Sequence, residues 1–482
     1  MSTQILIIAS YFLVLVAIGF NSKKHLKSSL AFQGIGLGVM MSASASAGEW
    51  LGGTSTIGVS EYGFDFGISG SWYTIANGIG MIFLALFFAK LYRSMESVTI
   101  PGIIGKLLGR QARIWSSVFL IFVMLAVGTS QMIAAGSLGM TLFGLNFITV
   151  VIGSAVIFIT MTLSGGMIAI AKTHTLHLVS LYGGAILALI LSLGQAGGVA
   201  SLAEGLPAGH FDMTAIGTPK IFSWVVASLL GACTAQASIQ PILAAKDART
   251  AKRASLIAAV VVAPFGILTA LLGMVARLLS DRGKLSNSAG QAITDGKQAL
   301  PALMLSLPPV ASGIIMASIL AAILATISSI ILASGTMFTR DIYQSLIHPK
   351  ADERRLFLAS RISTATAGLV CAIAAIFLNS GSIRVLDIVY FAYSIRGALF
   401  VIVLLGLFWK RTSPRGAVLG MISTVVVGCF WVLYNKFAGH FPINAAISET
   451  YASISTALVS TILFSMMLPK RKEEEIPRKT SN

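Results

Sequence analysis

The sequence predicts an all-α membrane protein that crosses the bilayer about thirteen times. Of its 482 residues, 56% are hydrophobic and 11% are charged, and the mean hydropathy is +0.86. A helix needs about 20 apolar residues to cross the hydrocarbon, and the hydrophobic residues gather in runs of that length. The three cysteines, Cys233, Cys371 and Cys429, fall inside apolar runs without disulfide or metal-ligand spacing. The pattern therefore excludes soluble domains and a disulfide-stapled fold.

Apolar runs of sufficient length predict the individual spans. These runs lie at 3–20, 33–59, 68–89, 115–137, 147–163, 165–194, 221–242, 255–279, 302–336, 359–379, 387–409, 416–435 and 445–468. No basic segment precedes the first run and no small-residue cleavage pattern follows it. We therefore expect this run to remain in the mature protein rather than to be removed as a signal.

The distribution of charge predicts the orientation. Most of the 34 Lys and Arg fall in the loops after the first, third, seventh, ninth and eleventh spans and in the C-terminal tail. Cytoplasmic loops of membrane proteins carry such an excess. We therefore expect a multi-pass protein of the plasma membrane, of bacterial inner-membrane type, with the N-terminus outside and the C-terminus in the cytoplasm. Because the cations are scattered between spans, the net charge of +17 does not indicate a nucleic-acid partner.

Two spans differ from ordinary lipid-facing helices. The stretch 41–58 (MSASASAGEWLGGTSTIG) is rich in Gly and Ser and contains Glu49, and 231–241 (GACTAQASIQP) repeats this character five spans later. Secondary transporters built from inverted repeats place an interrupted helix at the start of each half, where it binds ions and solute. Close packing of helices through small residues is the alternative explanation.

This spacing predicts a five-plus-five arrangement of LeuT type, with one extra helix before it and two after it. The expected units are, in chain order, an N-terminal helix with a basic cytoplasmic loop (1–32), a first repeat (33–194), an outer loop (195–220), a second repeat (221–409), two C-terminal helices (410–468) and a cytoplasmic tail (469–482).

Several short patches carry a resemblance to a known family. They are 46–58 (SAGEWLGGTSTIG), 97–102 (SVTIPG), 236–246 (QASIQPILAAK) and 321–329 (AAILATISS). In this order and spacing the chain resembles the sodium/solute symporter family, which carries sugars, proline, pantothenate and sialic acid. The resemblance implies inverted repeats, alternating access and solute uptake driven by the sodium gradient. Na⁺ is then the only expected cofactor, with no organic cofactor.

The resemblance also implies a sodium site between the first broken helix and the ninth span. Carried over to this chain, its ligands are Ser42, Ala45, Ala322, Ala325 and Thr326. An unwound helix and a hydroxyl offer the oxygen atoms that a hard cation needs within hydrocarbon. For Thr326, a hydroxyl bonded to its own helix is the alternative.

Two departures from the family pattern bear on sodium coupling. Ala325 stands where the family has a second hydroxyl, so the missing ligand is expected to be replaced by water or by a neighbour such as Ser328 or Ser329. His174 stands where members with an additional sodium have an aspartate. An imidazole does not replace a carboxylate as a sodium ligand, so we expect no second sodium site.

Polar residues within the spans predict the solute site. Glu49 lies on the first broken helix, and Arg396 in the eleventh span could meet a carboxylate with two parallel hydrogen bonds. Gln236 and Gln240 are four residues apart and share a helix face, and Trp72 could stack on a ring. The alternatives are structural hydrogen bonds for Glu49, internal pairing for Arg396 and an interfacial belt for Trp72.

These observations leave more than one mechanism open. The leading hypothesis is cation-coupled symport, most simply with Na⁺, of a small polar organic solute that carries a carboxylate. Proton coupling through His174 or Glu49 is one alternative, since an imidazole titrates near neutral pH, and an uncoupled facilitator of the same fold is another. His174 and His177 suggest no third ligand for a transition metal. No enzyme site is predicted, and the expected partners are the solute and the lipid bilayer, with no obligate protein partner.

Overall fold

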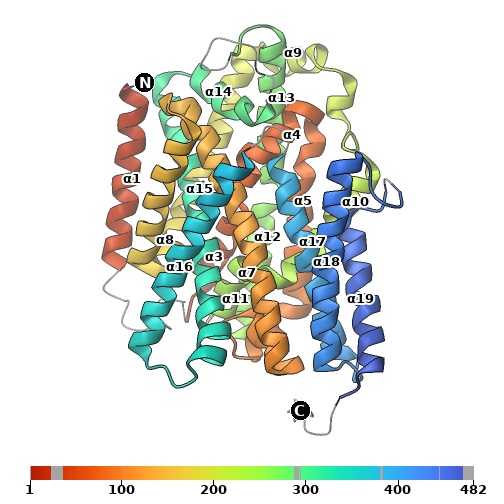
Figure 1. The fold of residues 1–482 in the computed structure, drawn as a ribbon. Helices are drawn as coiled ribbons and strands as arrows, with labels where there is room; N and C mark the ends of the chain where they lie inside the picture. Colours follow the sequence, from red (N-terminus) through yellow and green to blue (C-terminus); the bar gives the residue numbers. More distant parts are fainter. Residues whose placement is uncertain are drawn as a thin grey trace.

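The computed structural model describes residues 2–22, 36–286, 293, 295–379, 384–444 and 446–470, and the named secondary-structure elements in these ranges are all helices (Figure 1). The prediction of an all-α membrane protein is confirmed. The basic loop after the first predicted span and the tail from residue 471 lie outside the described residues.

The first part of the chain forms helices of very different lengths, and glycines kink the two longest of them. The helices are α1 (Ser2–Ser22), α3 (Val39–Trp50), α4 (Val59–Phe66), α5 (Trp72–Phe83), α6 (Ala89–Ser94), α7 (Ile100–Phe143), α8 (Phe147–Ala196) and α9 (Gly198–Gly205). Gly109 in α7 and Gly166 in α8 have positive φ, so each helix is kinked there. The kink at Gly166 separates the two spans predicted at 147–163 and 165–194.

The second part of the chain is also built from helices. The helices are α10 (Thr218–Gly231), α11 (Gln236–Leu243), α12 (Ala248–Val262), α13 (Phe265–Asp281), α14 (Ala299–Ser306), α15 (Pro309–Met337), α16 (Glu353–Leu378), α17 (Val385–Phe408), α18 (Pro414–Ala438) and α19 (Glu449–Met467). Pro264 separates α12 from α13, because proline cannot donate the backbone hydrogen bond that a continuous helix needs.

The number of spans differs from the prediction. Within the described residues, ten helices are long and apolar enough to cross a membrane, or eleven if the bent pair α10 and α11 forms one span. The count of thirteen is therefore not confirmed. Two predicted spans are not among these helices. They are 3–20, where α1 lies, and 33–59, whose end belongs to the helical stretch from Thr54 to Ser94 together with the whole of the next predicted span.

Both stretches expected to be interrupted contain a break. Helix α3 ends at Trp50, Leu51 leaves the helical region (φ −102°, ψ 66°), and the chain resumes as a π-helical turn at Thr54–Gly58. In the second stretch Ala235 leaves the helical region (φ −70°, ψ 80°), and the axes on either side differ by 43°. These breaks leave backbone groups without helical partners in the middle of the bundle.

The two broken helices are joined to each other. Helix α11 packs against α3, and Leu37 forms a parallel bridge with Ala245. The Leu37 amide donates to the Ala244 carbonyl at 2.9 Å, and the Lys246 amide donates to the Leu37 carbonyl at 3.0 Å. The breaks of the two halves therefore face one common region of the bundle.

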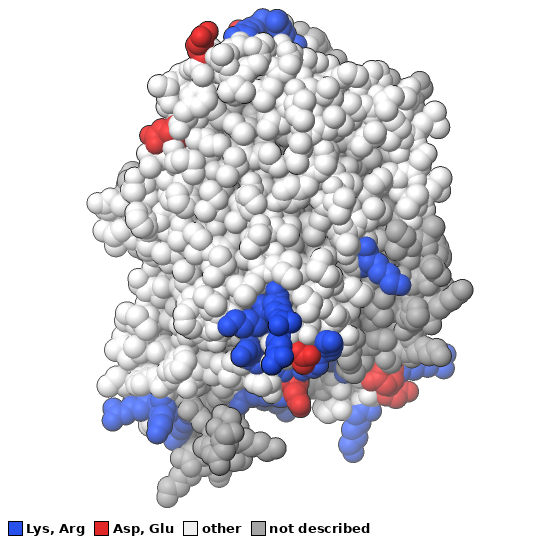
Figure 2. Space-filling view, turned by 180° about the vertical axis from the view of Figure 1, so that it is seen from behind, with Lys and Arg blue, Asp and Glu red and all other residues white. Residues whose placement is uncertain are grey.

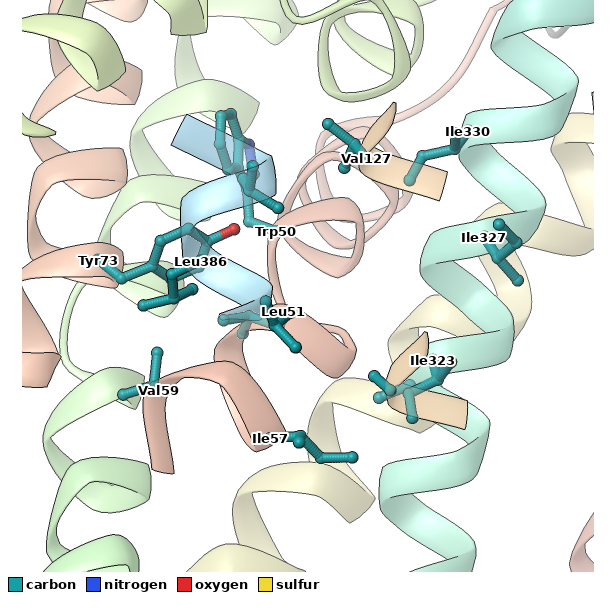
Figure 3. Packing of buried hydrophobic residues seen from close by; sticks show 14 of the residues in the cluster. Trp50, Leu51, Ile57, Val59, Tyr73, Val127, Ile323, Ile327, Ile330 and Leu386 are labelled. Atoms are coloured by element: carbon teal, nitrogen blue, oxygen red, sulfur yellow. The ribbon is translucent and has the colours of Figure 1, made fainter. Parts of the chain in front are cut away.

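Helix α15 forms the wall of that region. It packs against α7, α8, α16 and α1, and 94% of its most apolar window is buried. Figure 3 shows Ile323, Ile327 and Ile330 along α15, with Val127 of α7 next to Ile330. A helix that is apolar on all sides belongs in the interior of a large bundle, so α15 can position polar atoms precisely where it does carry them.

Candidate functional site

The break after α3 is held against α15 by one hydroxyl. The Thr326 Oγ1 donates to the Gly48 carbonyl at 2.9 Å, and both residues are buried. A methyl group at Gly52 would lie 2.2 Å from this Oγ1, so only glycine permits the approach. Gln131 of α7 completes the contact, because its Oε1 accepts from the Gly53 amide at 2.7 Å. The hydroxyl of Thr326 therefore bonds to the break and not to its own helix.

His174 of α8 lies between two of the predicted sodium ligands. Its Nδ1 is 3.2 Å from the Ala45 carbonyl oxygen and its Nε2 is 3.1 Å from the Ala325 carbonyl oxygen. The Ser329 Oγ is 3.4 Å from the same Nε2, and the imidazole is fully buried. An imidazole between the two carbonyls prevents one cation from contacting both, since a hard cation binds oxygen at roughly 2.4 Å.

The structure thus brings part of the predicted sodium set together. Ala45, Ala325, Thr326 and Ser329 meet around His174 and the α3 break. Ser328 and Ala322 are buried on α15 nearby in sequence, and the Ser42 Oγ is buried without a hydrogen-bond partner. Among the described residues, no three His, Cys, Asp or Glu gather as metal ligands.

Arg396 and Glu49 form a polar centre beside the same break. Arg396 is fully buried, and its Nε donates to the carbonyl of Gly231, the last residue of α10, at 3.3 Å. Its Nη1 and Nη2 have no hydrogen-bond partner, and neither has the Oε2 of Glu49. Burial without a partner is costly for a charged group, so these atoms are available for a ligand.

Aromatic side chains enclose this polar centre. The guanidinium of Arg396 lies 4.5 Å from the ring centroid of Tyr393 and 5.2 Å from that of Trp50. The hydroxyls of Tyr73 and Tyr393 are 3.1 Å apart, and the Trp50 Nε1 donates to the Ser238 Oγ of α11 at 2.7 Å. Figure 3 shows Trp50 and Tyr73 on the same side of the α3 break.

The remaining predicted solute residues lie elsewhere. The Gln236 Oε1 accepts from the Ile100 amide at 2.8 Å, and its Nε2 donates to the Val98 carbonyl at 3.1 Å, so this amide fastens α11 to the start of α7. The Gln240 Nε2 donates to the Thr336 Oγ1 at 3.4 Å. The Trp72 Nε1 donates to the carbonyl of Met213 in the loop before α10, at 2.9 Å.

A cavity beside the start of α10 is separated from the polar centre by aromatic rings. The cavity has a volume of about 370 Å³, and its lining includes Lys220, Asp387 and the stacked pair Trp224 and Tyr390, whose centroids are 4.3 Å apart. Tyr390 in turn contacts Tyr393 edge to face at 5.5 Å. Because Asp387 and Arg396 are nine residues apart on α17, the two sites are roughly 14 Å apart along the helix.

Sequence reasoning missed several residues of the centre. Tyr393 could have been found, because it lies three residues before Arg396 and shares its helix face. Asn77 of α5 follows Tyr73 by four residues, and both polar atoms of its fully buried amide have no hydrogen-bond partner. No local sequence signal marks Ser238 as the partner of Trp50.

Comparison with known proteins identifies the family. The model of the sodium:solute symporter family matches residues 32–424. The chain belongs to the sodium:solute symporter family. It is therefore a membrane-spanning symporter and not an enzyme.

Curated relatives of this symporter match along most of their length. The sodium/glucose cotransporter of Vibrio parahaemolyticus is 24% identical over 400 residues, which cover 78% of this chain and 74% of the relative. The high-affinity proline transporter PutP of Bacillus subtilis (strain 168) is 25% identical over 420 residues, covering 83% and 85%. The human sodium/myo-inositol cotransporter 2 is 26% identical over 467 residues, covering 88% and 69%.

A solved structure supports the same fold. A Na⁺-coupled sialic acid symporter, in a substrate-bound outward-open state, superimposes with a TM-score of 0.78 over 97% of this chain and 98% of that one, at 17% identity. A likeness at this identity establishes the shared architecture, which is of LeuT type. Mhp1, a nucleobase-cation-symport-1 family transporter in a closed conformation, superimposes with a TM-score of 0.58 at 12% identity.

Proposed function

We propose that this symporter couples the entry of Na⁺ to the uptake of a small polar organic solute by alternating access. The observation that carries the proposal is the placement of the Ala45 and Ala325 carbonyls on the two sides of His174 and of the Thr326 hydroxyl at the α3 break, next to buried Arg396 and Glu49. Ion and solute would then bind on two sides of one unwound segment, which is how differential binding can couple them.

The proposed units follow the two breaks. Residues 33–194 form the first repeat and 221–409 the second, with 1–32 before them, 195–220 as the outer loop between them, and 410–468 and the tail 469–482 after them. In support, α3 and α11 contact each other through the bridge of Leu37 with Ala245. Rocking of one repeat against the other would open the common region to each side in turn.

Sodium binding requires His174 to leave its position between the carbonyls. Once the imidazole moves and α3 and α15 close on the space that it leaves, the Ala45 and Ala325 carbonyls and the Thr326 hydroxyl offer three oxygens, and Ser328, Ser329, Ala322 and Ser42 supply the rest of the proposed set. Without His174, the α3 break loses one contact with α8 and gains one with the ion. Sodium binding would therefore change the conformation of the segment that carries Glu49.

The orientation proposed is N-terminus outside and C-terminus in the cytoplasm, in the plasma membrane. Figure 1 places the start of α1 and the end of α19 at opposite ends of the bundle. Figure 2 shows Lys and Arg mainly toward the lower end of the face in view, the end at which α19 terminates. A positive end supports its assignment to the cytoplasm.

Two steps test the function. Thermal unfolding of the purified symporter is measured with a panel of metabolites in NaCl and in KCl at matched ionic strength, because a ligand that binds the folded state raises the midpoint. The best ligand is then offered to proteoliposomes with an inward sodium gradient. Accumulation above the external concentration supports the proposal. Accumulation driven only by a proton gradient would favour coupling through His174 or Glu49, and equilibration without accumulation would favour a facilitator.

A further inference from the structure

The polar centre holds a guanidinium whose donors are unused. Arg396 has no exposed surface, yet only its Nε forms a hydrogen bond, to the Gly231 carbonyl. Its Nη1 and Nη2 have no partner. The rings of Trp50 and Tyr393 cover the guanidinium but offer only their π faces. Two parallel N–H donors in one plane match the two oxygens of a carboxylate.

A carboxylate of opposite charge lies close by without an ion pair. Glu49 is 4% exposed and its Oε2 has no hydrogen-bond partner. Glu49 immediately precedes Trp50, whose ring lies 5.2 Å from the guanidinium carbon of Arg396. Among the described residues, the ion pairs join other acids to other cations and none includes Glu49 or Arg396. The centre therefore holds one positive and one negative group, both with unused polar atoms.

Charge balance restricts the ligand. A solute with only a carboxylate would satisfy Arg396 but would be repelled by Glu49, and a solute with only an amine would do the reverse. An uncharged polyol would offer hydroxyls to the unused atoms of both groups but no charge of its own, so its hydrogen bonds would be weaker than those between two ions. A solute that carries one group of each sign satisfies both residues and leaves the centre neutral.

We propose that the solute is a small zwitterion of the amino-acid type. Its carboxylate accepts two hydrogen bonds from Nη1 and Nη2 of Arg396, and its protonated amine donates to Oε2 of Glu49. The face of Trp50 covers the solute between the two groups, and the Tyr73 and Tyr393 hydroxyls, which bond to each other, limit its size. The inference rests on the proposed function and deepens it by naming the substrate class.

The decisive experiment uses trios of compounds with one carbon skeleton. Suitable trios are L-alanine, propionate and ethylamine, and L-proline, cyclopentanecarboxylate and pyrrolidine. Amino acids with a longer distance between the amino and carboxyl groups, such as β-alanine and γ-aminobutyrate, are tested with their matched anions and amines. The uncharged compound is myo-inositol. Thermal unfolding and calorimetric Kd are measured on the full chain in NaCl. We expect binding of the zwitterion of at least one trio, with its anion and amine partners weaker by about tenfold to a hundredfold.

Two variants show which residue binds the carboxylate of the solute and which binds its amine. In Glu49→Gln the preference for the zwitterion over its matched anion should shrink about tenfold, and in Arg396→Gln the preference over the matched amine should shrink by a similar factor. Arg277→Gln is the control, because Arg277 pairs with Asp281 four residues along α13, away from the centre. Both preferences should be unchanged in this control.

The outcomes separate the two proposals. If the wild-type symporter binds the anion alone or the polyol more tightly than every zwitterion, the inference is overturned, and this result needs no variant to fold. If such a solute nevertheless accumulates under a sodium gradient, the proposed function stands without the inference. A zwitterion that binds to the centre but never accumulates would overturn the proposed function and leave the assignment of the site intact.

Discussion

Replacing Thr326 by valine tests the sodium site most sharply. Valine keeps the branched shape of threonine but removes the Oγ1 that donates to the Gly48 carbonyl at 2.9 Å. The buried carbonyl then loses this donor, which costs about 1–3 kcal/mol. If the hydroxyl is also a sodium ligand, the loss of one of about five or six oxygens should weaken sodium binding about tenfold, which corresponds to ~1.4 kcal/mol.

The two effects are separated by the choice of salt. Thermal unfolding in KCl reports the lost hydrogen bond alone, and the additional stabilisation in NaCl reports sodium binding. We expect Thr326→Val to unfold at a lower temperature than the wild type in both salts. We also expect it to need about tenfold more Na⁺ for half of its sodium-specific stabilisation. Thr326→Ser should recover most of both effects, since it restores the hydroxyl.

The control for this variant lies on the same helix. Ser334 of α15 is also buried, but its Oγ donates to the Ile330 carbonyl of its own helix at 2.9 Å. Ser334→Ala should therefore leave the sodium titration unchanged. Wild-type sodium dependence in Thr326→Val would refute the participation of Thr326 in the ion site, whatever its effect on stability.

Three further predictions follow from individual contacts. His174→Ala opens the space between the Ala45 and Ala325 carbonyls, so sodium titrations should reach half-saturation at a lower concentration than in the wild type, and a higher value would contradict the proposed exchange. Gln236→Leu frees the backbone of residues 98 and 100, so tryptic cleavage after Arg93 should become faster, and an unchanged rate would show that the amide does not fasten the loop. The Thr250 amide donates to Asp247 and lowers the pKa of this carboxyl, so the charged cap stabilises α12 above the usual carboxyl pKa and loses this effect as the pH falls through the lowered pKa. Asp247→Ala should consequently unfold earlier than the wild type at pH 7, with a difference that narrows in acid.

The sequence indicated the spans and breaks well because both are local properties. Runs of apolar residues mark helices in lipid, and clusters such as the one around Gly52 mark places where a helix can end. The count of spans was harder to predict, since whether 54–94 forms one stretch or two depends on how π-helical turns join its helices. Apolar composition alone does not distinguish these cases.

Contacts between distant residues could not be predicted in the same way. Gln236 and Gln240 share a helix face, as expected. Gln236, however, bonds to Ile100 and Val98, which lie more than a hundred positions earlier in the chain, and no local pattern reveals such contacts. Likewise His174 was recognised as a departure from the family pattern, but its position between Ala45 and Ala325 depends on how α8 packs against α3 and α15. Arg396 and Glu49 were found because ionisable groups in apolar runs are rare.

The most direct test of sodium-coupled symport is uptake of the best-binding solute into proteoliposomes under an inward Na⁺ gradient, with an equal K⁺ gradient as the reference. The account predicts accumulation above the external concentration in Na⁺, equilibration at most in K⁺, and loss of the difference when the sodium gradient is collapsed. Equal uptake in the two salts would contradict it.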